Sequence, residues 1–221
     1  MATLEDQVVV MAKVPVAGQV KTRLAPAFRP DQAAAVHSAM LQCVLDRLTQ
    51  HLPGRRVLAL AGVQSQSDDR LVVPDGWFVV QQGAGDLGQR MGHVWAQIGA
   101  GKAVFFGSDS PDVPKATLGR IWPALADSEA VIGPSTDGGY WALGAARFSP
   151  VLLDHIDWGG STVYDQTRTA AWSSDIRMAV LPLWHDVDHP ADLSALRCRL
   201  ESADEPSLVR LRRSLRQVCD L

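Results

Sequence analysis

The sequence predicts an α/β fold with a mostly parallel sheet. Short apolar runs alternate with segments of helical spacing along the 221 residues, as in domains whose parallel strands are joined by helices. The run Ala103–Phe106 contains no polar residue, which is typical of a strand buried on both faces of a parallel sheet. A chain of this length can also bury one sizeable hydrophobic core.

The expected elements follow in chain order. Strands are predicted at 7–12, 56–61, 77–80, 103–106, 130–133 and 178–183. Helices are predicted at 30–52, from residue 88 through 98, and at 115–126, 149–156, 162–172, 190–202 and from 206 onward. Pro123 is expected to bend or end the helix 115–126, and Ser161 to cap the helix from Thr162. The polar segment 64–69 is predicted to be a loop.

The helix at 30–52 has the clearest periodicity, with one apolar side suited to a core. Its apolar positions are Ala33, Val36, Met40, Val44 and Leu48. Pro30 suits its first turn. We expect the two histidines of this helix, His37 and His51, to lie at the surface.

Composition narrows the possible functions. Hydrophobic residues make up 47% of the chain and charged residues 20%, which is ordinary for a globular protein. A net charge of -3 gives no electrostatic reason to expect binding to nucleic acid or to a membrane surface. No apolar stretch reaches the ~20 residues that a membrane span needs. The N-terminus lacks the basic region of a signal peptide, so we expect a cytoplasmic protein.

The three cysteines indicate neither disulfide bonds nor a zinc site. Cys43, Cys198 and Cys219 are widely spaced and match neither a disulfide pattern nor a zinc motif. The chain shows no internal repeat, linker or low-complexity segment. We therefore expect one domain over residues 1–221, with a helical extension at 202–221.

Two carboxylates follow the strand at 103–106. Asp109 and Asp112 stand three residues apart, at a place where open α/β sheets bind ligands. Carboxylates there suit a hard cation such as Mg²⁺. A simple turn, in which Asp109 or Ser110 caps backbone amides, explains the same residues.

The loop after the first strand carries two cations near a glycine. Gly18 permits close backbone approach, while Lys21 and Arg23 could reach anionic oxygens. The loop is not a Walker A motif, because the second glycine and its spacing are missing. It suits a phosphate cradle, but from the loop alone a solvated basic loop is the preferred interpretation.

A formal G-x-G-x-x-G occurs at 83–88, after a predicted strand and before a predicted helix. Asp109 follows about 20 residues later, as the dinucleotide-binding fingerprint requires. An NAD-dependent oxidoreductase is therefore an alternative. Two features count against this alternative. The motif follows the third predicted strand and not the first, and Asp109 is embedded in a turn.

Two further loops carry candidate ligands. Asp137, followed by two glycines and two aromatic residues, predicts either a β-turn or a place where a ligand meets backbone and rings. Trp141 and Trp158 sit beside glycines, so we expect them near a ligand. Near the end of the chain, Asp186, Asp188 and the imidazoles of His185 and His189 could bind a metal. Equally, Asp188 or His189 could simply begin the helix that follows.

Together the motifs resemble the nucleotide-diphospho-sugar transferase (GT-A) superfamily. Within it, the chain is similar to a glycosyltransferase-like family of unknown function, related to phospholactate and molybdenum-cofactor guanylyltransferases. The blocks that carry the resemblance, in this order, are AKVPVAGQVKTRL, QGAGDLGQRM, FFGSDSPDVP, VIGPSTDGGYWALG, DWGGSTVYDQT and DVDHPADL. They span nearly all of residues 7–195. Ala17 replaces a usual proline and His189 a usual threonine, and neither change removes a charge.

The resemblance implies a three-layer α/β/α sandwich around a mixed, mostly parallel sheet. It also implies roles for individual residues. The implied nucleotide-binding residues are Lys13, Gly18, Lys21, Arg23, Gly85, Asp86 and Arg90. The implied substrate-binding residues are Asp137, Gly138, Gly139, Tyr140, Ser161 and Thr162. Asp109, with Asp188 or Asp186, would hold Mg²⁺ or Mn²⁺, and Lys21, Asp109 and Asp188 form the implied catalytic set.

We therefore expect a metal-dependent transferase that uses a nucleotide or nucleotide-sugar donor and a small-molecule acceptor. Sugar transfer from a nucleotide-diphospho-sugar is the first choice. Nucleotidyl transfer from an NTP to a phosphorylated acceptor is the alternative, followed by an NAD-dependent oxidoreductase and a non-catalytic nucleotide-binding protein.

Overall fold

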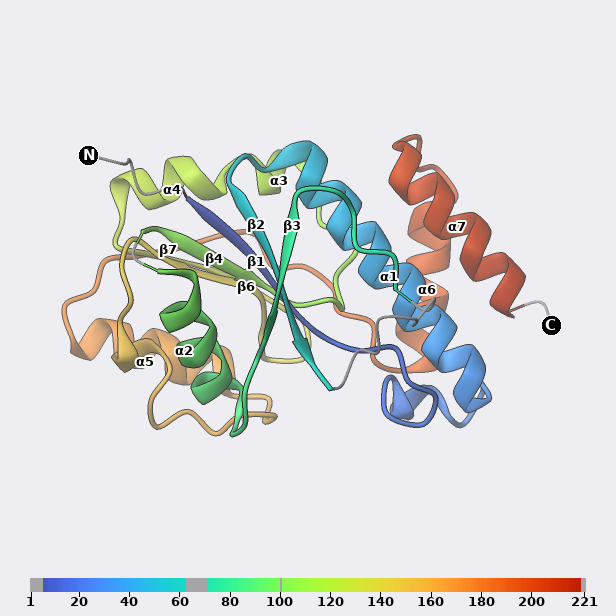
Figure 1. Cartoon of the computed structure of the whole chain (residues 1–221), viewed down its shortest axis with the longest axis horizontal. Helices are drawn as coiled ribbons and strands as arrows, with labels where there is room; N and C mark the ends of the chain where they lie inside the picture. Colours follow the sequence, from blue (N-terminus) through green and yellow to red (C-terminus); the bar gives the residue numbers. More distant parts are fainter. Residues whose placement is uncertain (1–5, 63–70, 100, 220–221) are drawn as a thin grey trace.

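The core of the molecule is a seven-stranded sheet. The structure is a computed structural model that describes residues 6–62, 71–99 and 101–219 (Figure 1). Its strands are β1 (Gln7–Lys13), β2 (Arg55–Ala61), β3 (Trp77–Gln81), β4 (Ala103–Phe106), β5 (Ala130–Pro134), β6 (Tyr140–Ala145) and β7 (Met178–Val180). They lie in the order β3-β2-β1-β4-β6-β5-β7. Only β6 in this described sheet runs antiparallel to its neighbours β4 and β5. The predicted mixed, mostly parallel sheet is confirmed.

Helices cover both faces of the sheet and form the three predicted layers (Figure 1). They are α1 (Pro30–His51), α2 (Leu87–Ile98), α3 (Lys115–Leu118), α4 (Ile121–Asp127), α5 (Val163–Ser173), α6 (Pro190–Leu200) and α7 (Pro206–Cys219), with 3₁₀ turns η1 (Thr22–Leu24) and η2 (Pro150–Leu152). Helices α1, α3 and α4 lie on one face, and α2 and α5 on the other.

The central strands are apolar on both sides because both sides are covered. In β4, Phe106 packs into the cluster under α1 and α4, while its neighbour Phe105 packs into the cluster under α2. In β1, Val8 and Val9 divide between the same two clusters. Successive side chains of a strand point to opposite faces, so an uninterrupted apolar run is what a doubly covered strand requires.

A third hydrophobic cluster joins α1, α6 and α7. Leu211 and Leu215 of α7 are buried there against Val36 and Met40 of α1. Helix α7 therefore packs its apolar face against α1 and α6, beside the sheet and its covering helices (Figure 1).

Several predicted element boundaries were wrong. The segment 115–126 is broken at Gly119 and Arg120, not at Pro123, which lies in the first turn of α4, where a proline costs no helical hydrogen bond. Thr162, not Ser161, is the N-cap residue of α5, and it makes no side-chain cap. Strand β6 was not predicted. Only a 3₁₀ turn forms within 149–156, and β7 ends before 183. The predicted loop at 64–69 lies outside the described residues.

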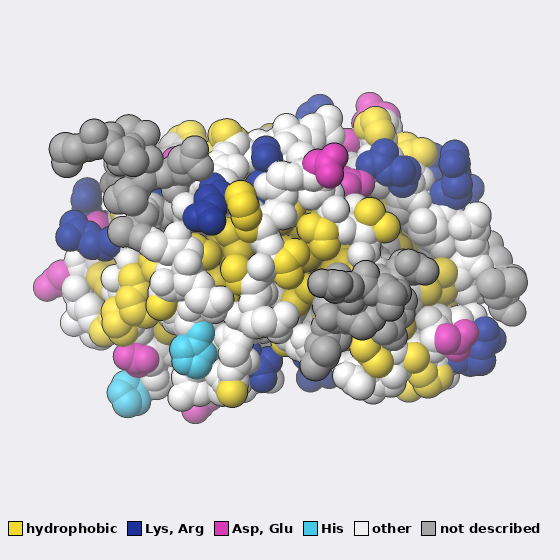
Figure 2. Space-filling view, in the orientation of Figure 1, with side chains coloured by type: hydrophobic (Ala, Val, Ile, Leu, Met, Phe, Trp, Pro, Cys, Tyr) yellow, Lys and Arg dark blue, Asp and Glu magenta, His cyan; other side chains and the backbone are white. Residues whose placement is uncertain are grey.

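Strand β3 forms one edge of the sheet and carries exposed apolar side chains. Phe78 is 53% exposed, and the guanidinium of Arg55 lies 4.6 Å from its ring centre. Figure 2 shows hydrophobic side chains gathered in the middle of the face that β3 crosses. None of the helices in the described ranges has the length and apolar character that crossing a bilayer requires.

Candidate functional site

Two adjoining cavities open at the carboxyl ends of β1 and β4. The larger has a volume of about 770 Å³ and the smaller about 290 Å³. Both are lined by Asp109, Asp188 and Arg23, so the two spaces meet at these charged groups. This is the sheet edge at which α/β proteins bind ligands.

Lys21 lies at the junction and is the most buried charged group there. Its backbone is left-handed (φ 46°), which turns the side chain inward from the loop that precedes η1. The ammonium lies 2.7 Å from Asp109 Oδ1 and 2.9 Å from Asp188 Oδ1, and it donates to the Val187 carbonyl at 2.5 Å. Only 4% of the side chain is exposed. The interpretation of this lysine as an exposed loop residue was therefore wrong.

Charge pairing decides the protonation of this group. Burial alone would lower the pKa of Lys21, but the nearby Asp109 and Asp188 outweigh it and raise the pKa above its ordinary value. Burial alone would raise the pKa of Asp188, but Lys21 and Arg23 hold it below its ordinary value. Arg23 Nη1 lies 2.9 Å from Asp188 Oδ2, so both oxygens of this carboxylate are engaged.

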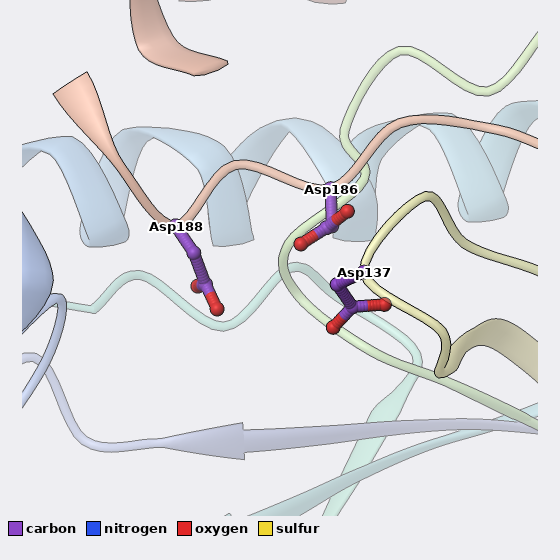
Figure 3. A group of neighbouring side chains, drawn as sticks. All are labelled: Asp137, Asp186 and Asp188. Carbon is purple, nitrogen blue, oxygen red and sulfur yellow. The ribbon is translucent and has the colours of Figure 1, made fainter. Parts of the chain in front are cut away.

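Three carboxylates gather in the larger cavity. Oxygen atoms of Asp137, Asp186 and Asp188 all lie within 4.8 Å of one another. In Figure 3, Asp186 and Asp188 project to the same side of one segment, and Asp137 approaches from the turn between β5 and β6. Burial, and then the charge of Asp137, raises the pKa of Asp186. A set of hard oxygen ligands whose charges repel one another fits a divalent cation such as Mg²⁺ or Mn²⁺.

The turn between β5 and β6 holds Asp137 in place. Its Oδ1 accepts hydrogen bonds from Ser135 Oγ at 2.5 Å and from the Gly139 amide at 2.8 Å. Thr136 Oγ1 donates to Asp186 Oδ1 at 3.0 Å, which links this turn to the acidic segment. Sequence reasoning placed Asp137 in the acceptor pocket and not among the metal ligands. The Asp-Gly-Gly sequence is typical of a hairpin turn, and nothing in it indicates that Asp137 lies near Asp186 and Asp188.

Asp109 and Asp112 separate into two roles. Asp109 Oδ1 accepts from Lys21 and from Ser108 Oγ, and its carboxylate lies outside the group of three. Asp112 is 8% exposed and faces away from the cavities, with Arg199 Nε at 2.6 Å and Trp184 Nε1 at 3.1 Å. The second carboxylate of the motif therefore fastens the loop to α6.

The smaller cavity is rich in cationic groups. Lys13 and Arg90 line it together with Lys21 and Arg23. Neither Lys13 nor Arg90 makes an ion pair among the described residues. Arg90 Nε donates to the Gly85 carbonyl at 2.7 Å. Such a group of cations matches the charge of phosphate oxygens.

His37 also lines this cavity, and the expectation that it lies at the surface was wrong. It is 4% exposed, because the apolar face of α1 turns it under the loop after β1. Its Nε2 lies 3.0 Å from the Lys13 carbonyl, which can only accept, so Nε2 carries the proton. Burial lowers the pKa of His37. The buried Nδ1 has no partner among the described residues.

The lining of the larger cavity also includes aromatic side chains. Tyr140 and Trp158 meet edge to face with ring centres 6.3 Å apart. Trp141 also lines the cavity but is 3% exposed and donates to the Pro182 carbonyl, so it belongs mainly to the core. Trp158 lines the larger cavity, and its expected place near a ligand stays a prediction.

Some predicted site residues lie outside both linings. They are Gly18, Gly85, Asp86, Gly138 and Thr162. Asp86 accepts from the Gln89 amide at 2.8 Å and so caps α2. Gly138 (φ 89°) lies so close to Ser161 that a Cβ would overlap the backbone of Ser161. The G-x-G-x-x-G motif follows the edge strand β3, whereas a dinucleotide fingerprint follows the first strand at the centre of the sheet.

Family comparison agrees with the motif blocks. The family model of DUF2064, described as an uncharacterized protein conserved in bacteria, matches residues 44–160. The chain belongs to this family. No curated protein sequence matches it.

Solved structures share the fold of this DUF2064 chain. A candidate nucleotide-diphospho-sugar transferase from Desulfovibrio desulfuricans G20 is 28% identical, with a TM-score of 0.84 over 96% of this chain and 97% of that chain. Rv0371c from Mycobacterium tuberculosis H37Rv, crystallised with manganese, is 24% identical, with a TM-score of 0.54 over 90% and 100%. A CMP:2-keto-3-deoxy-manno-octonic acid synthetase bound to CTP is 11% identical, with a TM-score of 0.57 over 89% and 98%. The last two show a common fold alone.

Proposed function

We propose that this DUF2064 protein is a metal-dependent transferase that moves a glycosyl group from a nucleotide-diphospho-sugar to a small acceptor. The observation that carries the proposal is the pair of adjoining cavities that share Asp109 and Asp188. One cavity is cationic and the other acidic and aromatic, as a donor and an acceptor of different chemistry require. The similarity to the Desulfovibrio protein supports a nucleotide-sugar donor.

The smaller cavity is the proposed donor site. Lys13, Arg23 and Arg90 would contact the diphosphate, and Lys21 would hold Asp109 and Asp188 in position beside it. Their charge stabilises a diphosphate leaving group, which gains negative charge as the glycosyl bond breaks.

The proposed metal ligands are Asp137, Asp186 and Asp188, whose oxygen atoms lie close together. Asp109 lines both cavities beside this group and is a further candidate ligand. Bound Mg²⁺ or Mn²⁺ would neutralise diphosphate charge. The manganese complex of Rv0371c gives this proposal a precedent within the same fold. Engaged by Lys21 and Arg23, Asp188 is already ionised and oriented.

The larger cavity is the proposed acceptor site, and its lining includes Asp137, Gly139, Tyr140 and Ser161. In the transfer, the anomeric carbon gains a bond to the acceptor oxygen and loses its bond to the diphosphate oxygen. The nucleoside diphosphate leaves with that bonding pair, and the acceptor proton passes to a carboxylate of the cavity and then to water. Asp109 and Asp188 lie at the cavity junction, where they would be placed to accept this proton.

Nucleotidyl transfer is the second candidate, because a synthetase that binds CTP has the same fold. A screen of NTPs and nucleotide sugars with Mg²⁺ or Mn²⁺ separates the two. Release of a nucleoside diphosphate supports sugar transfer, and release of pyrophosphate supports nucleotidyl transfer. Turnover of no donor, or a thermal shift by NAD(H) without metal, contradicts both.

Asp109→Asn provides a second test of the site. The amide is a poor partner for Lys21 and for a hard cation, so metal-dependent nucleotide binding should weaken while the fold persists. Asp127→Asn, at the end of α4 and in the lining of neither cavity, is the matched control. Equal nucleotide affinity of the two variants in calorimetry would remove Asp109 from the site.

A further inference from the structure

We infer that the acceptor is an uncharged hydroxyl compound with a ring, and not a phosphorylated or carboxylated one. This inference rests on the proposed function and concerns the same site. It follows from how the charges divide between the two cavities and from the aromatic wall of the larger one.

The larger cavity has no positive charge to spare for an anionic acceptor. Its described charged lining consists of four acids, Asp109, Asp137, Asp186 and Asp188, against Arg23 and His189. Arg23 is paired with Asp188, and a histidine is not a permanent cation. Lys21 and Arg23 balance two of the four acids, and one divalent cation would balance the other two. A phosphate monoester would enter this space as uncompensated negative charge, which is unfavourable.

The smaller cavity has the opposite composition. Besides the paired Lys21 and Arg23, it holds Lys13 and Arg90, which make no ion pair among the described residues. Phosphate groups are therefore attracted to one side of the junction and repelled from the other. The separation assigns the phosphate-bearing substrate to the donor side.

The aromatic wall supplies the binding surface for a neutral acceptor. The indole of Trp158 packs against α2, where a Cβ at Gly88 would come within 2.8 Å of it, and it forms a T-shaped pair with Tyr140. Gly159 and Gly160, the next two residues, also line the cavity. Because glycine has no side chain, they leave the space beside the indole open. A fixed aromatic face beside a few polar groups is a common way to bind a ring while orienting its hydroxyls.

The test compares matched neutral and phosphorylated ligands on the full chain with Mg²⁺. The probes are phenyl glycosides of glucose, galactose and mannose and the 6-phosphate of each, with dissociation constants measured by saturation-transfer NMR. We expect at least one neutral glycoside to bind about tenfold or more tightly than its 6-phosphate. Equal or tighter binding of the phosphates, or binding of no neutral glycoside, would overturn the inference.

Two tryptophan variants locate the binding. Trp158→Ala should weaken the neutral glycoside at least fivefold, whereas Trp172→Ala should not, because Trp172 is 85% exposed and lines neither cavity. Equal affinities in the two variants would contradict the assignment to this wall.

Nucleoside diphosphates titrated into the same samples keep the two proposals apart. Their affinity should be the same in Trp158→Ala and Trp172→Ala, because the donor side does not include Trp158. If no nucleotide binds while the neutral preference holds, the proposed function fails and the larger cavity remains a site for neutral ring compounds. If nucleotide binds and the preference is absent, the inference alone fails.

Discussion

The ammonium of Lys21 lies 2.9 Å from the carboxylate of Asp188, although 167 positions separate the two residues in the sequence. The same ammonium lies 2.7 Å from Asp109, so one buried cation joins the loop after β1, the loop after β4 and the segment before α6. The Val187 amide donates to the Asp109 carbonyl at 3.0 Å and adds a backbone link between the last two. The junction of the cavities is therefore built around Lys21.

Replacing Lys21 should destabilise the fold, because Asp109 and Asp188 would lose their shared partner. We expect Lys21→Met to lower the free energy of unfolding by about 2 kcal/mol, the usual scale for hydrogen bonds to charged groups. Mn²⁺ should restore more stability to this variant than to the wild type, because the ammonium no longer competes for the carboxylates. Urea unfolding with and without Mn²⁺ measures both effects.

Lys13→Met is the control for this prediction. Lys13 is exposed, so its loss should change the free energy of unfolding by no more than about 0.5 kcal/mol. If Lys21→Met were as stable as Lys13→Met, the ion pairs of Lys21 would contribute nothing to the fold.

Asp137 should matter for metal binding although its sequence context is a tight turn. Asp137→Asn and Asp186→Asn should each weaken Mn²⁺ binding at least about tenfold, which is the lower end of what loss of an outer-shell partner costs at other metal sites. Asp127→Asn should bind as the wild type does. Calorimetric titration with Mn²⁺ tests this, and an unchanged affinity of Asp137→Asn would limit the site to the segment before α6.

The ion pair between α1 and the start of α7 should make stability depend on acid pH. Burial alone would raise the pKa of Glu205, but hydrogen bonds from Arg47, Ser207 and His51 outweigh it and lower the pKa to about 2. A carboxylate with a lowered folded pKa stabilises the fold above its ordinary value of 4.5. That contribution is lost as the pH falls from 4.5 toward 2.

Glu205→Gln measures this contribution. The variant should be less stable than the wild type by about 2–3 kcal/mol at pH 7, and the difference should shrink as the pH falls below about 4.5. Asp204→Asn is the control, since Asp204 makes no ion pair among the described residues. Urea unfolding at pH 7, 4.5 and 3 decides it. A difference that does not vary with pH would show that the ion pair is not its source.

Two glycines beside the larger cavity should respond differently to alanine. Both are left-handed, Gly138 at φ 89° and Gly159 at φ 90°, but only a Cβ at Gly138 would overlap another residue, Ser161. Gly159→Ala should cost about 1–2 kcal/mol from backbone strain alone. Gly138→Ala should cost more than about 3 kcal/mol. Thermal and urea unfolding compare the two, and equal costs would mean that the turn and the Ser161 loop separate readily.

The sequence predicted the sheet and the strand ends that border the two cavities because both depend on local patterns. Apolar runs such as Ala103–Phe106 can be read without knowledge of their neighbours. Strand β6 was missed because it directly follows the Asp-Gly-Gly turn and contains Gly144, and its pairing with β4 and β5 depends on residues distant in the sequence. His37 was wrongly predicted to be exposed because a polar residue is expected on the solvent side of a helix, whereas it lies among the buried residues of α1.

Local patterns in the sequence were enough to predict the α/β class, the position of Asp109 after a strand and the acidic pair Asp186 and Asp188 before a helix. These follow from periodicity and from residues that stop a strand or begin a helix. Only the folded chain shows that Lys21 is buried between Asp109 and Asp188, that Asp112 pairs with Arg199, and that Asp137 joins the acidic group. The physical reason is that a charge partner is chosen by distance in space. The partners here are 50 to 167 positions apart in the sequence, so no local pattern predicts which of them meet.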